Sequence, residues 1–423
     1  MVKVNIRIYS VTFFFLVVSL PIITYLFELN GIYIFQAAMY SNRIWAISIL
    51  VTSLLSIMYI ILNIRINIVL YSILILGLTV WGLIFNNSIS NVVVDIVIVF
   101  IIPILFLYHS YYIYKNNNMY TFLYIYKNMN IVFLSIISIP LFISNYKVTP
   151  DITFLLSYLL VTIFLSDLKY KVLSFPAILF ILLIGASKTV VFQLAFGILF
   201  IALVRNIRSI LTAAALLLAL LLASLTPASH INTSRAAAKL QSAFVGIQEA
   251  YQEGVTLYSV ISEPFNYLDT STAHRVYELN QVLKSIGGSY FTVLFGKGLG
   301  ATVDISGTRD ASVILAHKGR QNLGAVRVVH IGPAYVLLKA GVLGLCVYIY
   351  IIILSMHYAI KLLKPGNGLW EGAIGLSLML FIIGTLFSFS IYVKSPSMWI
   401  LYGFATALTS SQSRTESLKL KKI

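Results

Sequence analysis

Long apolar runs separated by short polar connections dominate the pattern of this 423-residue chain. The runs are continuous and do not alternate with polar positions, which is typical of buried or lipid-facing helices. Most of them approach the roughly 20 residues that a helix needs to cross the hydrocarbon core of a bilayer. We predict about twelve membrane-spanning helices, the fifth to eighth of them short or closely joined, near residues 9–27, 44–62, 66–85, 92–114, 131–146, 152–167, 172–186, 188–204, 209–227, 333–360, 369–391 and 395–411.

The composition agrees with this pattern. Hydrophobic residues make up 60% of the chain and charged residues only 10%, whereas about a quarter of a soluble domain is charged. Such a chain cannot bury its apolar surface within itself, so we expect an all-α, polytopic integral membrane protein. The net charge of +16 does not indicate nucleic-acid binding, because most Lys and Arg residues lie between apolar runs. The basic N-terminus lacks a small-residue cleavage site, which predicts a retained first helix.

The distribution of basic residues predicts the orientation in the membrane. If the N-terminus is cytoplasmic, the short connections and tails on that side carry fifteen Lys and Arg residues, and the opposite short connections carry four. Cytoplasmic loops of membrane proteins are enriched in such residues. We therefore expect both termini in the cytoplasm and three regions: a bundle of about nine helices over 1–227, one large external loop over 228–332, and three helices with a basic tail over 333–423.

The external loop is expected to be partly helical. Apolar residues recur at helical spacing in "SRAAAKLQSAFVGIQEAYQEGVTLYSVI" and in "DTSTAHRVYELNQVLKSI", where Thr270 or Ser271 is a candidate N-cap. From Gly287 to Ala325 the pattern becomes irregular, glycine-rich and basic. The stretch "FGKGLG" lacks the spacing of a nucleotide-binding loop. We interpret its glycines as tight turns: Gly296, Gly298 and Gly300.

Basic residues near the end of this loop suit an anionic substrate at the membrane surface. No acid lies between Asp310 and the following apolar run, and Lys318 and two arginines occur there. Arginine binds phosphate with two parallel hydrogen bonds. The simpler alternative, a solvated surface or contact with lipid headgroups, stays open. The loop arginines that we assign to substrate binding are Arg309, Arg320 and Arg327.

Four further residues are candidates for the chemistry. Arg275, on the second predicted loop helix, points to phosphate binding, or else pairs with Glu278 one turn away. His330, directly before the tenth run, is placed to take a proton from a hydroxyl, or else bonds a loop carbonyl. Lys188 and Lys339 are cations at or within apolar runs, which either snorkel to the surface or meet an anion. No group of His, Cys and acidic residues has metal-ligand spacing along the sequence, so we expect no metal site and no other cofactor.

The order of these features resembles the bacterial O-antigen polymerase and O-antigen ligase superfamily. "ASKT" precedes a pair of apolar runs, and then follow a long external loop with "HRVYELNQVLKSI", "VLFGKGLG" and "VVHIGPAYVLLKAGVLG". The topology matches along the whole chain, and the motifs match within about 185–345. Lys188 stands where the family commonly has arginine, and Ile331 stands where asparagine is common after His330.

The resemblance implies a membrane glycosyltransferase that acts on glycans linked to undecaprenyl diphosphate. It implies catalytic roles for Arg275 and His330, with Lys188, Lys339 and the loop arginines binding the diphosphate or the glycan. It further implies the bacterial inner membrane, an active site facing the periplasm, and membrane lipids and a polysaccharide chain-length regulator as partners. No nucleotide is implied, because the diphosphate is already a good leaving group, and no metal is implied, because arginines can replace its charge. No nucleic acid is implied either.

Other functions remain open on the sequence. A ligase would break the same bond in the same donor and transfer the glycan to lipid A-core. A transporter is the alternative from another class, although transporters often show inverted repeats and several intramembrane acids, and here Asp95 is nearly alone and the two halves of the chain differ. We favour O-antigen polymerisation because of the long external loop.

Overall fold

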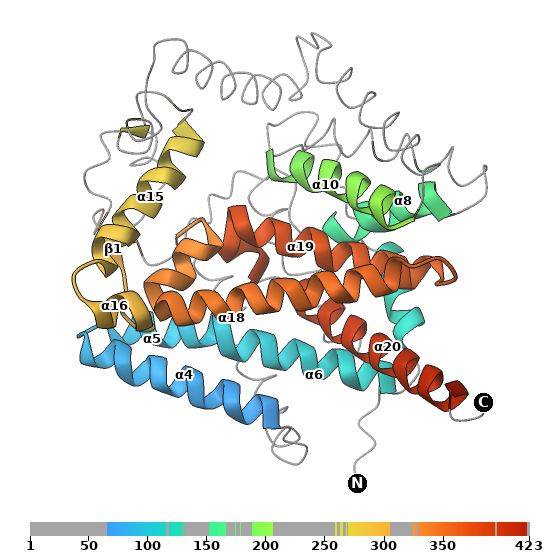
Figure 1. The fold of residues 1–423 in the computed structure, drawn as a ribbon, viewed down its shortest axis with the longest axis horizontal. Helices are drawn as coiled ribbons and strands as arrows, with labels where there is room; N and C mark the ends of the chain where they lie inside the picture. Colours follow the sequence, from blue (N-terminus) through green and yellow to red (C-terminus); the bar gives the residue numbers. More distant parts are fainter. Residues whose placement is uncertain are drawn as a thin grey trace, which may run out of the picture.

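The computed structural model describes residues 66–115, 118–128, 131, 152–165, 174, 178, 188–205, 259, 263–264, 268, 270–304, 325–326, 329–393 and 396–420. Most of these residues are helical (Figure 1). The helices are α4 Ile66–Ile84, α5 Ile89–Ile96, the π-helix η2 Val97–Ile101, α6 Ile102–Lys115, α8 Ile152–Leu165, α10 Lys188–Arg205, α15 Thr270–Ile286, α16 Tyr290–Phe295, α18 Gly332–Leu363, α19 Leu369–Val393 and α20 Pro396–Leu420.

Helix α19 forms the centre of the described bundle. It packs against α8, α10, α18 and α20, as Figure 1 shows for the layers above and below it. Its apolar side chains are buried over most of its length, including Phe381, which lies in a cluster with Phe154 of α8 and Phe404 of α20. A helix that is apolar all round and buried all round is the core element of a large helical assembly.

Helices α18 and α19 are both long and apolar enough to cross a membrane. They differ in their surroundings. In an apolar stretch of 18 residues, 78% of α19 is buried within the protein, whereas only 17% of the corresponding stretch of α18 is buried. A large apolar surface exposed along one helix is unfavourable in water and favourable in lipid. The described residues thus agree with a helical, membrane-associated chain.

The described helices agree closely with seven of the predicted apolar runs. The expected spans 66–85, 152–167, 188–204, 333–360, 369–391 and 395–411 match α4, α8, α10, α18, α19 and α20. The expected span 92–114 is helical too, but it is divided into α5, η2 and α6. The spans expected at 9–27, 44–62, 131–146, 172–186 and 209–227 lie outside the described residues except at a few positions, so the total of twelve stays a prediction.

Residues 228–332, which we expect to be external and call the external segment, contain elements that the apolar pattern indicates only in part. The second predicted loop helix is α15, which begins at Thr270. The stretch expected to be irregular contains the short helix α16, whose N-cap Ser289 and Thr292 form a reciprocal capping box. It also contains an antiparallel pair of two-residue strands, β1 Val303–Asp304 and β2 Ala325–Val326. The first predicted loop helix, over 234–261, lies outside the described residues apart from Ser259.

A small apolar cluster joins the external segment to the bundle. Val282 of α15 and Val303 of β1 pack with Ile98 of η2 and with Tyr335 and Leu338 of α18. All five are almost completely buried. This cluster fixes α15 beside the first turns of α18, on the left of Figure 1. It therefore positions the end of the external segment, where His330 precedes α18.

Candidate functional site

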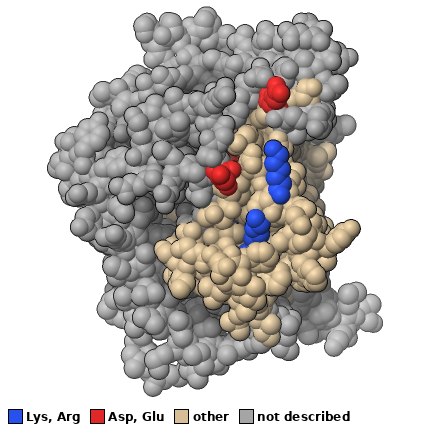
Figure 2. All heavy atoms as spheres, turned by 90° about the vertical axis from the view of Figure 1, so that its left-hand side faces the viewer, with Lys and Arg blue, Asp and Glu red and all other residues tan. Residues whose placement is uncertain are grey.

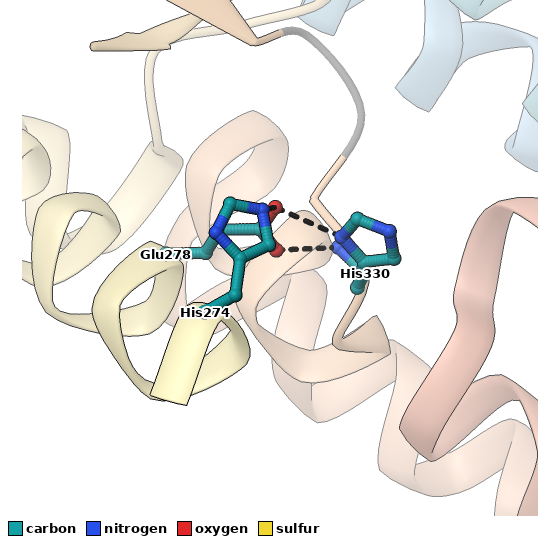
Figure 3. Close-up of side chains that lie close together, drawn as sticks. All are labelled: His274, Glu278 and His330. Atoms are coloured by element: carbon teal, nitrogen blue, oxygen red, sulfur yellow. Dashed lines mark hydrogen bonds and ion pairs between the residues drawn. The ribbon is translucent and has the colours of Figure 1, made fainter. Parts of the chain in front are cut away.

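Three side chains converge where α15 meets the start of α18 (Figure 3). His274 and Glu278 lie one turn apart on the same face of α15. His330 lies just before Ile331, the N-cap of α18, whose first turn carries Pro333 in a position that proline favours. The Nδ1 atom of His330 lies 2.8 Å from Oε1 of Glu278, and Nε2 of His274 lies 3.1 Å from the same oxygen. We call these three residues the histidine cluster.

Glu278 anchors the histidine cluster. Its side chain is 1% exposed, and its Oε2 accepts a hydrogen bond of 2.9 Å from the backbone N–H of His330. Burial acts to raise the pKa of this carboxyl, but the hydrogen bonds from His274 and His330 outweigh it and lower the pKa from 4.5 to about 2. The carboxylate is therefore ionised at neutral pH, and it accepts hydrogen bonds at both oxygens.

The ionised carboxylate determines how His330 is oriented. Since Glu278 can only accept, Nδ1 of His330 donates to it, and the neutral ring then carries its lone pair on Nε2. The His330 side chain is 41% exposed, in contrast to its partner. The same logic orients the histidine of an acid–histidine pair in hydrolases. The arrangement provides an exposed base held by a buried anion.

The histidine cluster also has a donor set that suits a metal ion. One ligand atom from each of its three residues lies within 4.8 Å of the others. Sequence spacing along the chain did not indicate this group, because His330 follows Glu278 by 52 residues. Zinc–nitrogen bonds of about 2.0–2.1 Å at tetrahedral angles hold ligand atoms about 3.3 Å apart. The separations of 2.8 and 3.1 Å are hydrogen-bond lengths, so protons between these atoms account for the geometry as it stands.

His274 contributes a buried polar atom that has no hydrogen-bond partner. Its Nε2 donates to Glu278, and its Nδ1 is buried without a bond among the described residues. The rings of His274 and His330 make an edge-on contact with centroids 5.7 Å apart. A second imidazole thus faces the exposed one across the same carboxylate.

A second charged pair lies two turns further along α18. Nζ of Lys339 is 2.7 Å from Oδ2 of Asp95, and the two side chains are 3% and 0% exposed. Asp95 also accepts from the backbone N–H of Gly300 at 2.7 Å and from the hydroxyl of Tyr335 at 3.0 Å, and Lys339 donates to the carbonyl of Ala301. The sequence analysis assigns Lys339 to substrate binding, whereas the structure gives its charge an anionic partner inside the protein.

The glycines of "FGKGLG" make the turns that join α16 to this pair. Gly296, Gly298 and Gly300 have φ angles of 70, 77 and 83°, a region that favours glycine. The backbone N–H groups of Lys297 and Gly298 donate to the carbonyls of Leu338 and Lys339.

Close packing at a kink explains two of the glycines. At Gly341 the backbone of α18 leaves the helical conformation. A Cβ atom at Gly296 would lie 2.6 Å from the backbone of Lys339 and Ala340, and one at Gly341 would lie 2.4 Å from Leu294. The turn therefore fits against α18 only because both positions lack side chains.

The other expected site residues are placed less completely. Arg275 neighbours His274 on α15 and is half-buried. Lys188 is the first residue of α10. Arg309, Arg320 and Arg327 lie outside the described residues. Glu278, offered by the sequence as an ion-pair partner of Arg275, hydrogen-bonds to two histidines.

Sequence reasoning missed His274, and it missed the role of Glu278. The available signal was their spacing of four residues on a predicted amphipathic helix, which places a histidine and an acid on one face. The pairing of Asp95 with Lys339 was missed as well, although each is an isolated charge in an apolar run.

Comparisons of the chain with protein-family models, with curated proteins and with solved structures give no match.

Proposed function

We propose that this chain is a membrane glycosyltransferase that polymerises O-antigen repeat units carried on undecaprenyl diphosphate. The acceptor is the non-reducing end sugar of a new repeat unit, and the donor is the growing glycan. The observation that carries the proposal is the His330 side chain, exposed at the start of a helix long enough to cross a membrane and bonded to the buried carboxylate of Glu278. The order of motifs that resembles the polymerase and ligase superfamily supports it.

Under this proposal, His330 acts as the general base. Its Nε2 lone pair removes the proton of the acceptor hydroxyl as the oxygen attacks the anomeric carbon of the donor glycan. The bond between that carbon and the diphosphate oxygen breaks, and undecaprenyl diphosphate leaves with the bonding electrons. Glu278 stabilises the imidazolium that forms, because it stays ionised and already accepts from Nδ1. The proton then passes to solvent.

The charge that develops on the leaving diphosphate requires cations. Arg275, on the same helix as Glu278, is the described candidate, and its planar guanidinium binds two phosphate oxygens at once. Lys188, Arg309, Arg320 and Arg327 complete the proposed binding set. Lys339 is excluded from this set, because Asp95 and the carbonyl of Ala301 already surround its ammonium group.

The proposed topology puts this chemistry on the periplasmic side of the bacterial inner membrane. It keeps about twelve spans with both termini in the cytoplasm, as the distribution of Lys and Arg predicts. Figure 1 supports it in that α15, α16 and the start of α18 lie together at one end of the described bundle. The C-terminus lies toward the other end of the bundle.

Reconstitution with a defined substrate tests the proposal. The purified full-length protein in vesicles receives one synthetic undecaprenyl-diphosphate repeat unit and no other protein, and the products are separated on a gel. We expect a ladder of glycans that is absent with His330→Ala or Arg275→Ala at equal folded amounts. Transfer that appears only after lipid A-core is added identifies a ligase. Flux of the substrate across the membrane without bond formation identifies a transporter, and either result overturns polymerisation.

A further inference from the structure

The kink at Gly341 divides α18 into two parts of different character. Residues 342–363 extend for about 33 Å at 1.5 Å per residue, close to the roughly 30 Å thickness of the hydrocarbon core. Before the kink, Ala334, Tyr335 and Leu338 are buried against the external segment. Exposed large apolar side chains begin directly after it, at Val342 and Leu343. The lipid-facing surface of α18 therefore begins at the kink.

Helix α4 presents a similar surface beside α16. Ile73, Leu76, Val80 and Ile84 are large, apolar and exposed. At the end of α4, the indole N–H of Trp81 donates to the carbonyl of Gly296 at 3.0 Å, and its ring lies 6.0 Å from that of Phe295. Two apolar, exposed helices thus converge on the same short turn.

Helix α16 lies at the level of the kink and is exposed on an aromatic face. Tyr290 and Phe291 are 91% and 66% exposed, and Leu294 and Phe295 are exposed beside them. The backbone of Leu294 lies directly against Gly341, so this face continues the exposed surface of α18 over residues 342–363. Among the described residues on this side of the molecule, Figure 2 shows a mostly uncharged surface with a few basic and acidic side chains.

We propose that α16 is an interfacial helix, with Tyr290 and Phe291 inserted at the boundary between the headgroups and the acyl chains of the leaflet nearest the histidine cluster. Aromatic residues concentrate at this depth of a membrane, and apolar faces of interfacial helices lie about 5–10 Å into it. The proposal rests on the membrane-spanning part of the proposed function and not on glycosyl transfer.

This position of α16 sets the height of the histidine cluster. His330 precedes the kink by eleven residues. The nine steps from Gly332 to Gly341 correspond to about 14 Å along a helix, and the two steps before Gly332 add at most about 7 Å. The headgroup layer on each side of the bilayer is about 5–8 Å thick. His330 then lies just beyond the headgroups, within reach of polar groups attached to a lipid anchored in the same leaflet.

Spin-label depth measurements on the full-length protein in phosphatidylcholine vesicles test the proposal. The single cysteine is first removed by Cys346→Ala, and a nitroxide is attached through Phe291→Cys or, independently, Tyr290→Cys. Gly288→Cys is the matched control, because it is exposed one turn before α16 and has open space around it. Ile353→Cys, at an exposed position within residues 342–363 of α18, gives the reference depth for the membrane interior.

We expect labels at 290 and 291 to collide more with oxygen than with a water-soluble nickel chelate, at a depth between those of the 288 and 353 labels. Equal access of nickel to labels at 291 and 288, with the 353 label deep, overturns the interfacial helix while leaving the membrane span intact. Access of nickel to the 353 label as well overturns both the interfacial helix and the membrane span.

Discussion

The two charged clusters beside the start of α18 have similar components and opposite environments. Asp95 and Lys339 are completely enclosed, and every charged atom of the pair meets a partner of the protein. In the histidine cluster the carboxylate is equally buried, yet one of its partners, His330, is exposed over 41% of its side chain. The two lie close along the chain, since Lys339 follows His330 by only nine positions.

Under the proposed function, this difference separates a structural charge from a reactive one. A buried ion pair with all bonds satisfied has no capacity left for a ligand, and its removal leaves an uncompensated charge. A buried anion that orients an exposed imidazole can exchange a proton with something outside. The order of charges along a sequence does not distinguish these cases, because both histidine and lysine occur beside apolar runs.

The largest expected effect follows from breaking the closed pair on one side only. Lys339→Met keeps a similar volume and leaves Asp95 buried without its counter-charge, which destabilises by about 3–5 kcal/mol. The loss is measured as a lower midpoint of thermal unfolding in detergent. The double variant Asp95→Asn with Lys339→Met recovers part of the stability and retains activity. Full stability with inactivity in the single variant would instead assign Lys339 to the substrate.

Truncating the exposed base affects activity without affecting the fold. His330→Ala lowers the turnover of the reconstituted protein by about 10²–10⁴-fold, the usual contribution of a general base, and its unfolding midpoint stays near that of the wild type. His357→Ala, a histidine on the membrane-length part of α18, is the control and keeps its activity. If His330→Ala retains near-normal turnover, the histidine cluster is not the reaction centre.

A smaller effect is expected from Glu278→Gln, and it depends on pH. Because the pKa of this carboxyl is lowered from 4.5 to about 2, its stabilising effect is fully present above pH 4.5 and is lost as pH falls through about 2. At pH 7 the variant is less stable by about 1.5–3 kcal/mol, the range for hydrogen bonds to charged groups. Thermal unfolding of both proteins between pH 7 and pH 2.5 measures the difference. A gap that stays constant over this range contradicts the ionised Glu278.

The smallest expected effect comes from removing metal ions. The nitrogen–oxygen separations in the histidine cluster are those of hydrogen bonds, so treatment with a strong chelator leaves turnover unchanged. The measurement compares chelated protein before and after zinc or magnesium is restored. If activity is lost and a single kind of ion restores it, the histidine cluster is a metal site and His330 is not a free base.

The apolar pattern predicted the helices well and the contacts between them poorly. Continuous runs gave α4, α8 and α19 with nearly correct limits, since length and composition alone decide a membrane-length helix. The kink at Gly341 was not predicted, because it depends on the approach of Leu294 and Gly296 from another element. His330 is a candidate on the sequence for its place before α18, and its role stays a prediction. Its partner Glu278 entered the sequence analysis only as an alternative ion-pair partner of Arg275, because local spacing reveals neighbours on a helix and not contacts across 52 residues.

The two-residue ladder of β1 and β2 has a consequence for the length of the external segment. Val303 pairs with Val326 and Asp304 with Ala325, so Asp304 and Ala325 are neighbours in space although twenty residues lie between them in the sequence. Paired residues of antiparallel strands lie only about 4.5–5.5 Å apart, and doubling the length of a chain segment between fixed ends costs only about 0.6 kcal/mol in closure entropy. We therefore expect that a reporter domain inserted between Asp304 and Ala325 leaves His330 bonded to Glu278.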